Sequence, residues 1–90
     1  MGNAMMKTYL VLVDPEVEAQ LELGDDVVVL DRGVYLVRTT QTQSQLYHAV
    51  KRRLHPAKLL VAPLSSLPKF KGMRSGATKL ARALVLEAPR

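Results

Sequence analysis

An apolar run near the start of this 90-residue chain constrains its fold more than any other feature. Residues Lys7–Val13 carry large apolar side chains at every position from Tyr9 onward. Successive side chains of a strand point to opposite faces of the sheet, so a run without polar alternation indicates a strand buried on both faces. We therefore predict that Lys7–Val13 is a central strand of a sheet.

Two alternatives are open for the segment that follows this strand. Asp14 can cap a helix, Pro15 suits the first helical position, and Gly24 would end the helix. The residues of Val17–Leu23 instead alternate between apolar and polar, which is the period of a strand. The helix is the favoured alternative, and the strand stays open.

Three more strands are indicated further along the chain. Val27–Leu30 and Val34–Thr39 flank Gly33, which tolerates a positive φ and predicts a hairpin with a short loop. Lys58–Leu64 is apolar, and Pro63 near its end suits an edge strand or a strand terminus.

Two helices are predicted after the hairpin. Thr40 and Gln43 have the spacing of a capping box, and the helix that they open runs to Leu54, where Pro56 follows. Its predicted apolar face consists of Leu46, Tyr47, Val50 and Leu54. Residues 65–76 predict a loop, and Ala77–Leu86 predicts a helix with an apolar side of Ala77, Leu80, Ala81 and Leu84.

The order of these elements predicts the fold class. Strand, helix, strand, strand, helix, strand is the βαββαβ order of an α+β, ferredoxin-like antiparallel sheet, here with a C-terminal helical extension. We expect residues 1–6 to be a remnant of cloning or a disordered start, residues 7–64 to be the ferredoxin-like core, and residues 65–90 to be a basic loop and helix.

Charge is divided along the chain. Residues 1–32 hold two bases and seven acids, a net charge of −5, whereas residues 33–90 hold eleven bases and one acid, a net charge of +10. Such asymmetry indicates a polyanionic partner, with nucleic acid as the leading hypothesis.

Other features of the composition limit where the protein works. The chain has no cysteine, which excludes disulfides and thiolate metal sites and fits a reducing compartment, so a cytoplasmic location is predicted. No apolar run approaches the roughly 20 residues of a membrane span, and no signal peptide is predicted.

The candidate nucleic-acid-binding residues are lysines and arginines of the second half. They would neutralise backbone phosphates with little sequence preference, because no groove-reading motif accompanies them. Each group also has a structural alternative, since charges are expected on any solvated helix face. The candidates are Arg38, Lys51, Arg52, Arg53, Lys69, Lys71, Arg74, Lys79 and Arg82.

Asp14 is the candidate catalytic and metal-binding residue. A carboxylate at the end of a strand can bind Mg²⁺ or Mn²⁺, and two copies across a dimer axis would suit phosphodiester cleavage. Capping the next helix is the alternative role for Asp14. No complete catalytic motif is present, so a metal-dependent nuclease is the second functional hypothesis and no cofactor is expected otherwise. A protein-interaction or regulatory module is the third.

The chain also resembles a known family over about Lys7–Leu64. Tyr9–Asp14 resembles the first strand, with its terminal aspartate, of the small ferredoxin-like CRISPR-associated adaptation subunits and their SinR-like relatives. Val29–Thr39 is similar to the central hairpin strand of that family, and the next helix and strand match in order and spacing.

The resemblance implies a homodimer that binds nucleic acid. In some members of that family a divalent metal at the aspartate matching Asp14 supports cleavage. The first crossover here is shorter than is usual in the family, and Pro15–Glu18 stands where basic and aromatic residues often follow that aspartate. Acids at this position would repel a phosphodiester, so the resemblance implies binding more than cleavage.

Overall fold

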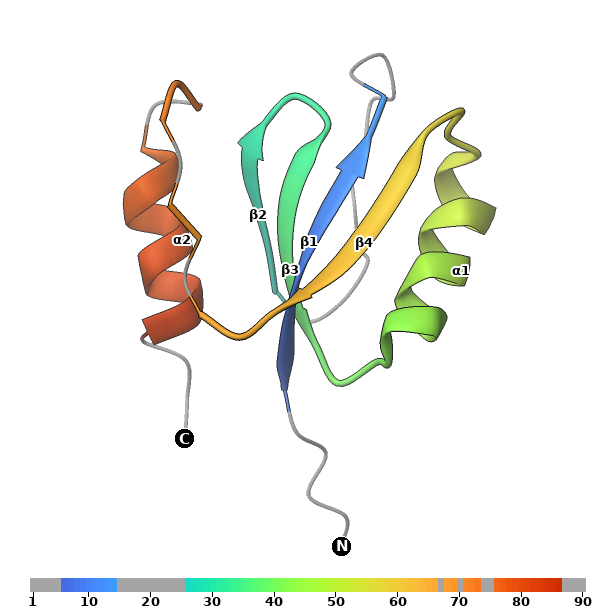
Figure 1. Ribbon diagram of the computed structural model, residues 1–90, viewed down its shortest axis with the longest axis horizontal. Helices are drawn as coiled ribbons and strands as arrows, with labels where there is room; N and C mark the ends of the chain where they lie inside the picture. The colour runs from blue at the N-terminus through green and yellow to red at the C-terminus, as the bar shows by residue number, and fades with distance from the viewer. Residues whose placement is uncertain (1–5, 15–25, 67, 70, 74–75, 87–90) are drawn as a thin grey trace, which may run out of the picture.

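The computed structural model describes residues 6–14, 26–66, 68–69, 71–73 and 76–86. These residues have an α+β fold, in which one open antiparallel sheet of four strands is accompanied by two helices (Figure 1). This confirms the predicted α+β class and the antiparallel sheet, while the helix predicted after Asp14 lies outside the described residues. The elements are β1 (Lys7–Val13), β2 (Asp26–Asp31), β3 (Val34–Thr39), α1 (Gln43–Leu54), β4 (Leu59–Leu64) and α2 (Ala77–Leu86).

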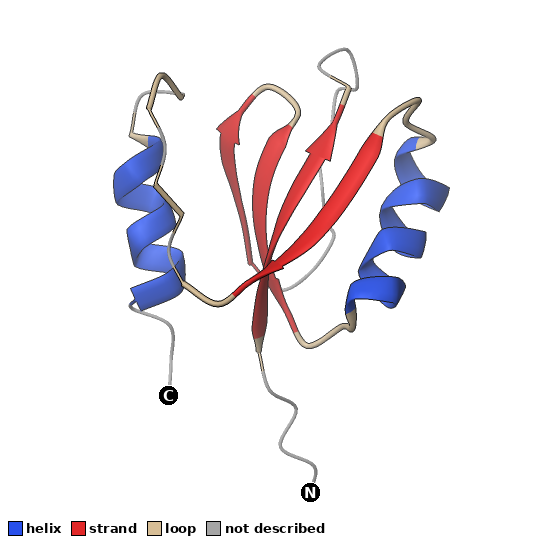
Figure 2. Cartoon of the chain, in the orientation of Figure 1, coloured by secondary structure: helices blue, strands red, loops and turns tan. Residues whose placement is uncertain are grey.

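The strands lie in the order β2-β3-β1-β4, and every neighbouring pair is antiparallel. Val11 of β1 is therefore opposite Tyr35 on one side and Val61 on the other. The prediction that Lys7–Val13 is a central strand is confirmed. α1 and α2 lie on opposite sides of the sheet (Figure 2), and the odd-numbered residues of β1 after Lys7 are buried on the α1 face, whereas Leu10 and Leu12 on the other face are half-buried.

The face covered by α1 holds the larger part of the described core. Alternate residues of β1 and β3 point to this face and meet the apolar side of α1. Tyr47 is an exception to the predicted apolar side, because it is 37% exposed. The buried members of this cluster are Tyr9, Val11, Val13, Tyr35, Val37, Leu46 and Val50.

The opposite face is covered by α2 over β2 and β3. Ala81 is fully buried there against Leu30 and Leu36, and Met73 from the preceding loop packs beside them. Leu80, which was predicted on the apolar side of this helix, is 52% exposed. A helix of ten residues that covers only one half of a sheet buries a narrow stripe, so an apolar neighbour of Ala81 can remain in solvent.

The N-terminus of α1 corrects the predicted capping box. Thr42, not Thr40, is the N-cap: its hydroxyl accepts from the backbone N–H of Gln45 at 3.1 Å, and the Gln45 side chain accepts from the N–H of Thr42 at 2.9 Å. The residues before the cap are held in a turn, because Gln41 donates its N–H to Thr39 Oγ1 and accepts from the Tyr9 hydroxyl. The box keeps the predicted spacing but begins two residues later.

The outer edge of β4 is partly closed. Pro63 has no N–H, so in an antiparallel ladder it fits a position whose backbone groups face away from β1, opposite Tyr9. Val61, two residues earlier, has the same orientation, and its carbonyl accepts a hydrogen bond from Gln43 Nε2 at 2.9 Å. A further strand would therefore find few free partners along this edge.

Candidate functional site

Segments that are far apart in the sequence lie together at one end of the sheet. β1 and β2 finish there, α1 ends there, and α2 begins there, which places these four points along the upper side of the molecule in Figure 1. The N–H of Val13 donates to the Gly33 carbonyl at 2.8 Å and so ties the end of β1 to the β2–β3 turn. Several secondary-structure elements therefore meet at this end of the sheet, and it is not formed by a single loop.

Lysine and arginine side chains are concentrated at this end. The last turn of α1 contributes three exposed cations, and Lys58 follows just before β4. The β2–β3 turn and the start of α2, with its preceding loop, add exposed cations of their own. We call this group the cationic end; its members are Arg32, Lys51, Arg52, Arg53, Lys58, Lys71 and Lys79.

The cations in the last turn of α1 interact favourably with the C-terminus of that helix. Carbonyl groups at the C-terminus of a helix carry partial negative charge, and Lys51, Arg52 and Arg53 in the last turn complement it. The helix then ends at His55, whose φ of 47° and ψ of 49° are left-handed, and whose N–H bonds the Lys51 carbonyl at 3.1 Å. This conformation reverses the chain so that Lys58 returns toward the same end.

Asp14 holds the returning chain in place. Its Oδ1 accepts from the N–H of Lys58 at 2.8 Å, and its Oδ2 accepts from the N–H of Ala57 at 3.2 Å. The hydrogen bond from Lys58 is the main cause that lowers the pKa of this carboxyl, partial desolvation opposes it, and Ala57 lowers it further. Asp14 therefore joins the end of β1 to the connection between α1 and β4, a role that neither of its two sequence-based interpretations had included.

A divalent metal at Asp14 finds little support in this geometry. Both carboxylate oxygens already accept backbone hydrogen bonds, whereas Mg²⁺ or Mn²⁺ takes several oxygen ligands at once. Within the described part of the chain, no three His, Cys, Asp or Glu side chains lie together in a way that could hold a metal ion.

The structure brings together only some of the predicted cations. Arg38 is 7% exposed on the α2 face of β3, so it is not available to a large polyanion. Lys69 precedes the cationic end in the loop, Arg82 is on a later turn of α2, and Arg74 lies outside the described residues. Lys58 was missed, although the short connection between α1 and β4 is a signal that could have placed it.

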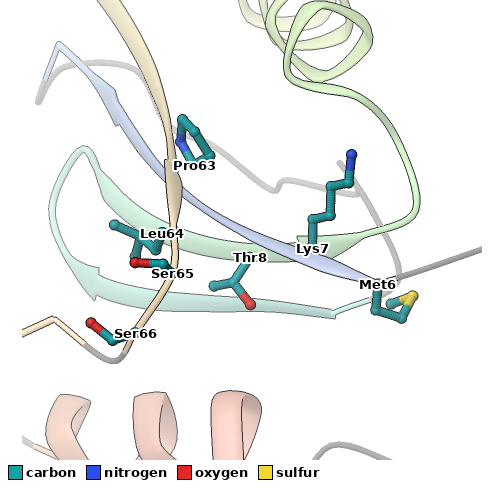
Figure 3. A pocket seen from close by; sticks show the side chains of 7 residues that line it. All are labelled: Met6, Lys7, Thr8, Pro63, Leu64, Ser65 and Ser66. Carbon is teal, nitrogen blue, oxygen red and sulfur yellow. The ribbon is translucent and has the colours of Figure 1, made fainter.

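A pocket of about 310 Å³ lies at the opposite end of the sheet, where β1 begins and β4 finishes (Figure 3). The side chains of Lys7 and Pro63 point to one side of the sheet, whereas Thr8 and Ser66 lie on the other. Its polar groups do not converge on one point, so it offers no arrangement for recognising a small molecule. Its walls are formed by Met6, Lys7, Thr8, Pro63, Leu64, Ser65 and Ser66.

Comparisons with models of protein families, with characterised proteins and with solved structures found no match to this chain. The family resemblance described above therefore stays a prediction. Within the described residues, neither helix has the length and apolar composition needed to cross a membrane.

Proposed function

We propose that this protein binds nucleic acid through its cationic end, by contacts with backbone phosphates and with little dependence on base sequence. The observation that carries the proposal is the arrangement of Lys51, Arg52 and Lys58. All three are exposed, and they lie on the two sides of one tight connection that His55 and Asp14 hold in place. Cations on a fixed framework lose less conformational entropy on binding than cations on a mobile tail.

The charge of the whole chain favours the same partner. Its net charge is +5, and the second half alone carries +10. A polymer with one negative charge per repeat can engage several of these cations together, and the release of its condensed counterions favours binding. No base-reading helix is predicted, so phosphate contacts would supply most of the affinity.

We further propose that the fold is ferredoxin-like. Counted from its other edge, the sheet order is β4-β1-β3-β2, all antiparallel, with α1 joining β3 to β4 across one face. This supports a ferredoxin-like core to which α2 is an extension on the opposite face. A place near the CRISPR-associated adaptation subunits is proposed on the same grounds.

We also propose that the protein is a homodimer in the cytoplasm. The apolar strip formed by Leu10, Leu12, Leu60 and Ala62 lies on the α2 face, beside the half of the sheet that α2 covers. Leu60 is 46% exposed there, and an apolar strip of this kind suits contact with a protein surface. The same strip favours the alternative function of a protein-interaction module. The absence of cysteine fits the reducing cytoplasm.

Salt dependence of binding tests the proposed function. Fluorescence anisotropy with a labelled mixed-sequence duplex would be measured at 50, 100 and 200 mM NaCl. If three phosphates are neutralised, the affinity should fall about forty-fold across this range. For the double variant Lys51→Ala/Arg52→Ala, the fall in affinity across the same salt range should be about ten-fold smaller, because two phosphate contacts are removed.

Lys7→Ala is the matched control for this experiment. Lys7 is also an exposed cation, but it starts β1 at the opposite end of the sheet, so its loss should leave affinity nearly unchanged. Equal weakening per charge removed in Lys7→Ala and in the double variant would show that only net charge matters. An affinity that does not change with salt, or no binding at 50 mM NaCl, would contradict the proposed function.

A further inference from the structure

The cationic end has contributions from both layers that flank the sheet. α1 and α2 pack on opposite faces, yet the last turn of α1 and the first turn of α2 lie at the same end (Figure 1). Lys51 and Arg52 are exposed on the first of these, whereas Lys79 is exposed on the second and Lys71 in the segment just before it. The two pairs of cations are thus separated by the thickness of the sheet.

The β2–β3 turn lies between these two pairs. It carries Arg32, which is exposed, and it is fixed to the end of β1 by the bond from Val13 to the Gly33 carbonyl. A polyanion that touches both layers must therefore pass over the end of the sheet, across this turn, and cannot run along either face.

The separation sets a length for the partner. Each helix axis lies about 10 Å from a sheet on which it packs, so the two helices are at least about 20 Å apart. The longest extent of the described fold, 39 Å, is the upper limit. At about 3.4 Å per base pair these limits correspond to roughly 6 to 11 base pairs.

The described residues of this end favour a duplex over a single strand. Binders of single strands usually stack bases on aromatic side chains. Of the described aromatic residues, Tyr9 and Tyr35 are buried in the core, and Tyr47 lines a hollow with Gln43 and Val61 near the start of α1. The described part of the cationic end therefore has phosphate-binding cations without a Phe, Tyr or Trp platform.

We infer that the partner is a nucleic-acid duplex that lies across the end of the sheet and is contacted from both layers over about 6 to 11 base pairs. This inference rests on the proposed function and adds the class of ligand and its path. Lys71 and Lys79 become binding residues equivalent to Lys51 and Arg52, although they belong to the opposite layer.

Duplex length and paired variants test the inference together. Lys51→Ala/Arg52→Ala and Lys71→Ala/Lys79→Ala would be compared with the unaltered chain on 6-, 12- and 18-base-pair duplexes and on an 18-nucleotide single strand. On the 18-base-pair duplex each double variant should reduce the slope of log affinity against log salt by about 1.8. On six base pairs, which is the lower limit for reaching both layers, each double variant should weaken binding less than it does on 18 base pairs.

The results separate this inference from the proposed function. Loss of affinity in the Lys51/Arg52 variant, with none in the Lys71/Lys79 variant, would keep the function and overturn the path across the sheet. A single strand that binds as tightly as the duplex would overturn the duplex as the partner. No salt-dependent binding by the unaltered chain would overturn both. Circular dichroism of every variant confirms that the fold is kept.

Discussion

Oδ1 of Asp14 accepts a hydrogen bond from the backbone N–H of Lys58 at 2.8 Å, across 44 positions of sequence. The second oxygen of the same carboxylate accepts from Ala57. The end of β1 is thereby joined to the connection between α1 and β4, and the residue that the sequence marked for catalysis organises the cationic end. Lys58 also favours the ionised carboxylate through its charge, so the two residues support each other.

Replacing Asp14 tests this structural role. Asp14→Ala removes both acceptors and should lower the melting temperature by a few degrees, while Asp14→Asn keeps one carbonyl acceptor and should lower it less. Thermal unfolding followed by circular dichroism at pH 7 measures both. A melting temperature of the alanine variant equal to that of the unaltered chain would remove the proposed role of these bonds.

The pH dependence of this contribution follows from its sign. The folded-state pKa of Asp14 lies below its ordinary value of 3.8, so the unfolded chain binds the proton more readily. The stabilisation is fully present above about pH 4, and it is lost as the pH falls through 3.8 to the lowered folded-state pKa. Urea unfolding of the unaltered chain and of Asp14→Asn should show a stability difference at pH 7 that shrinks on acidification to pH 3.

The sequence predicted those elements whose limits are set by nearby residues. β1 lies between a polar start and Asp14, and β3 follows the hairpin glycine, so both were found with their full bounds. The capping residue was missed because the Tyr9 hydroxyl, 32 positions away, fixes the Gln41 carbonyl and delays the helix. The role of Asp14 was missed for the same physical reason, since spacing along the chain contains no information on a long-range contact.

The corrected cap of α1 gives a pair of matched variants. Thr42→Ala removes the hydroxyl that accepts from Gln45 and should cost about 1 kcal/mol of unfolding free energy. Thr40→Ala changes the residue that the sequence pattern had favoured, and it should cost close to nothing because Thr40 is exposed and is not the N-cap. Chemical denaturation of both variants decides between the two caps. A larger loss for Thr40→Ala would mean that the helix begins where the sequence pattern placed it.

His55 should be a site where glycine stabilises the protein. Its left-handed φ of 47° costs a residue with a Cβ about 1–2 kcal/mol, a cost that glycine avoids. Part of this gain is offset because glycine makes the unfolded chain more flexible. We expect His55→Gly to raise the unfolding free energy by about 0.5 kcal/mol. His48→Gly, inside the same helix, should instead lower it by a few tenths of a kcal/mol. Destabilisation by both variants would show that the His55 side chain makes a contact worth more than the strain.

The proposed homodimer is tested at Leu60. Its side chain is 46% exposed on β4, opposite Leu12 in the register, so Leu60→Asp would place a charge in the middle of the apolar strip. Because the residue is exposed in the single chain, the monomer should still fold, whereas burial of an unpaired carboxylate at an interface is costly. Size-exclusion chromatography with light scattering should show the mass of two chains for the unaltered protein and of one chain for Leu60→Asp.

Leu80→Asp, on an exposed leucine of α2 outside the strip, should leave the dimer intact. A single-chain mass for the unaltered protein at all concentrations would exclude the homodimer, and dissociation by Leu80→Asp alone would move the interface to α2.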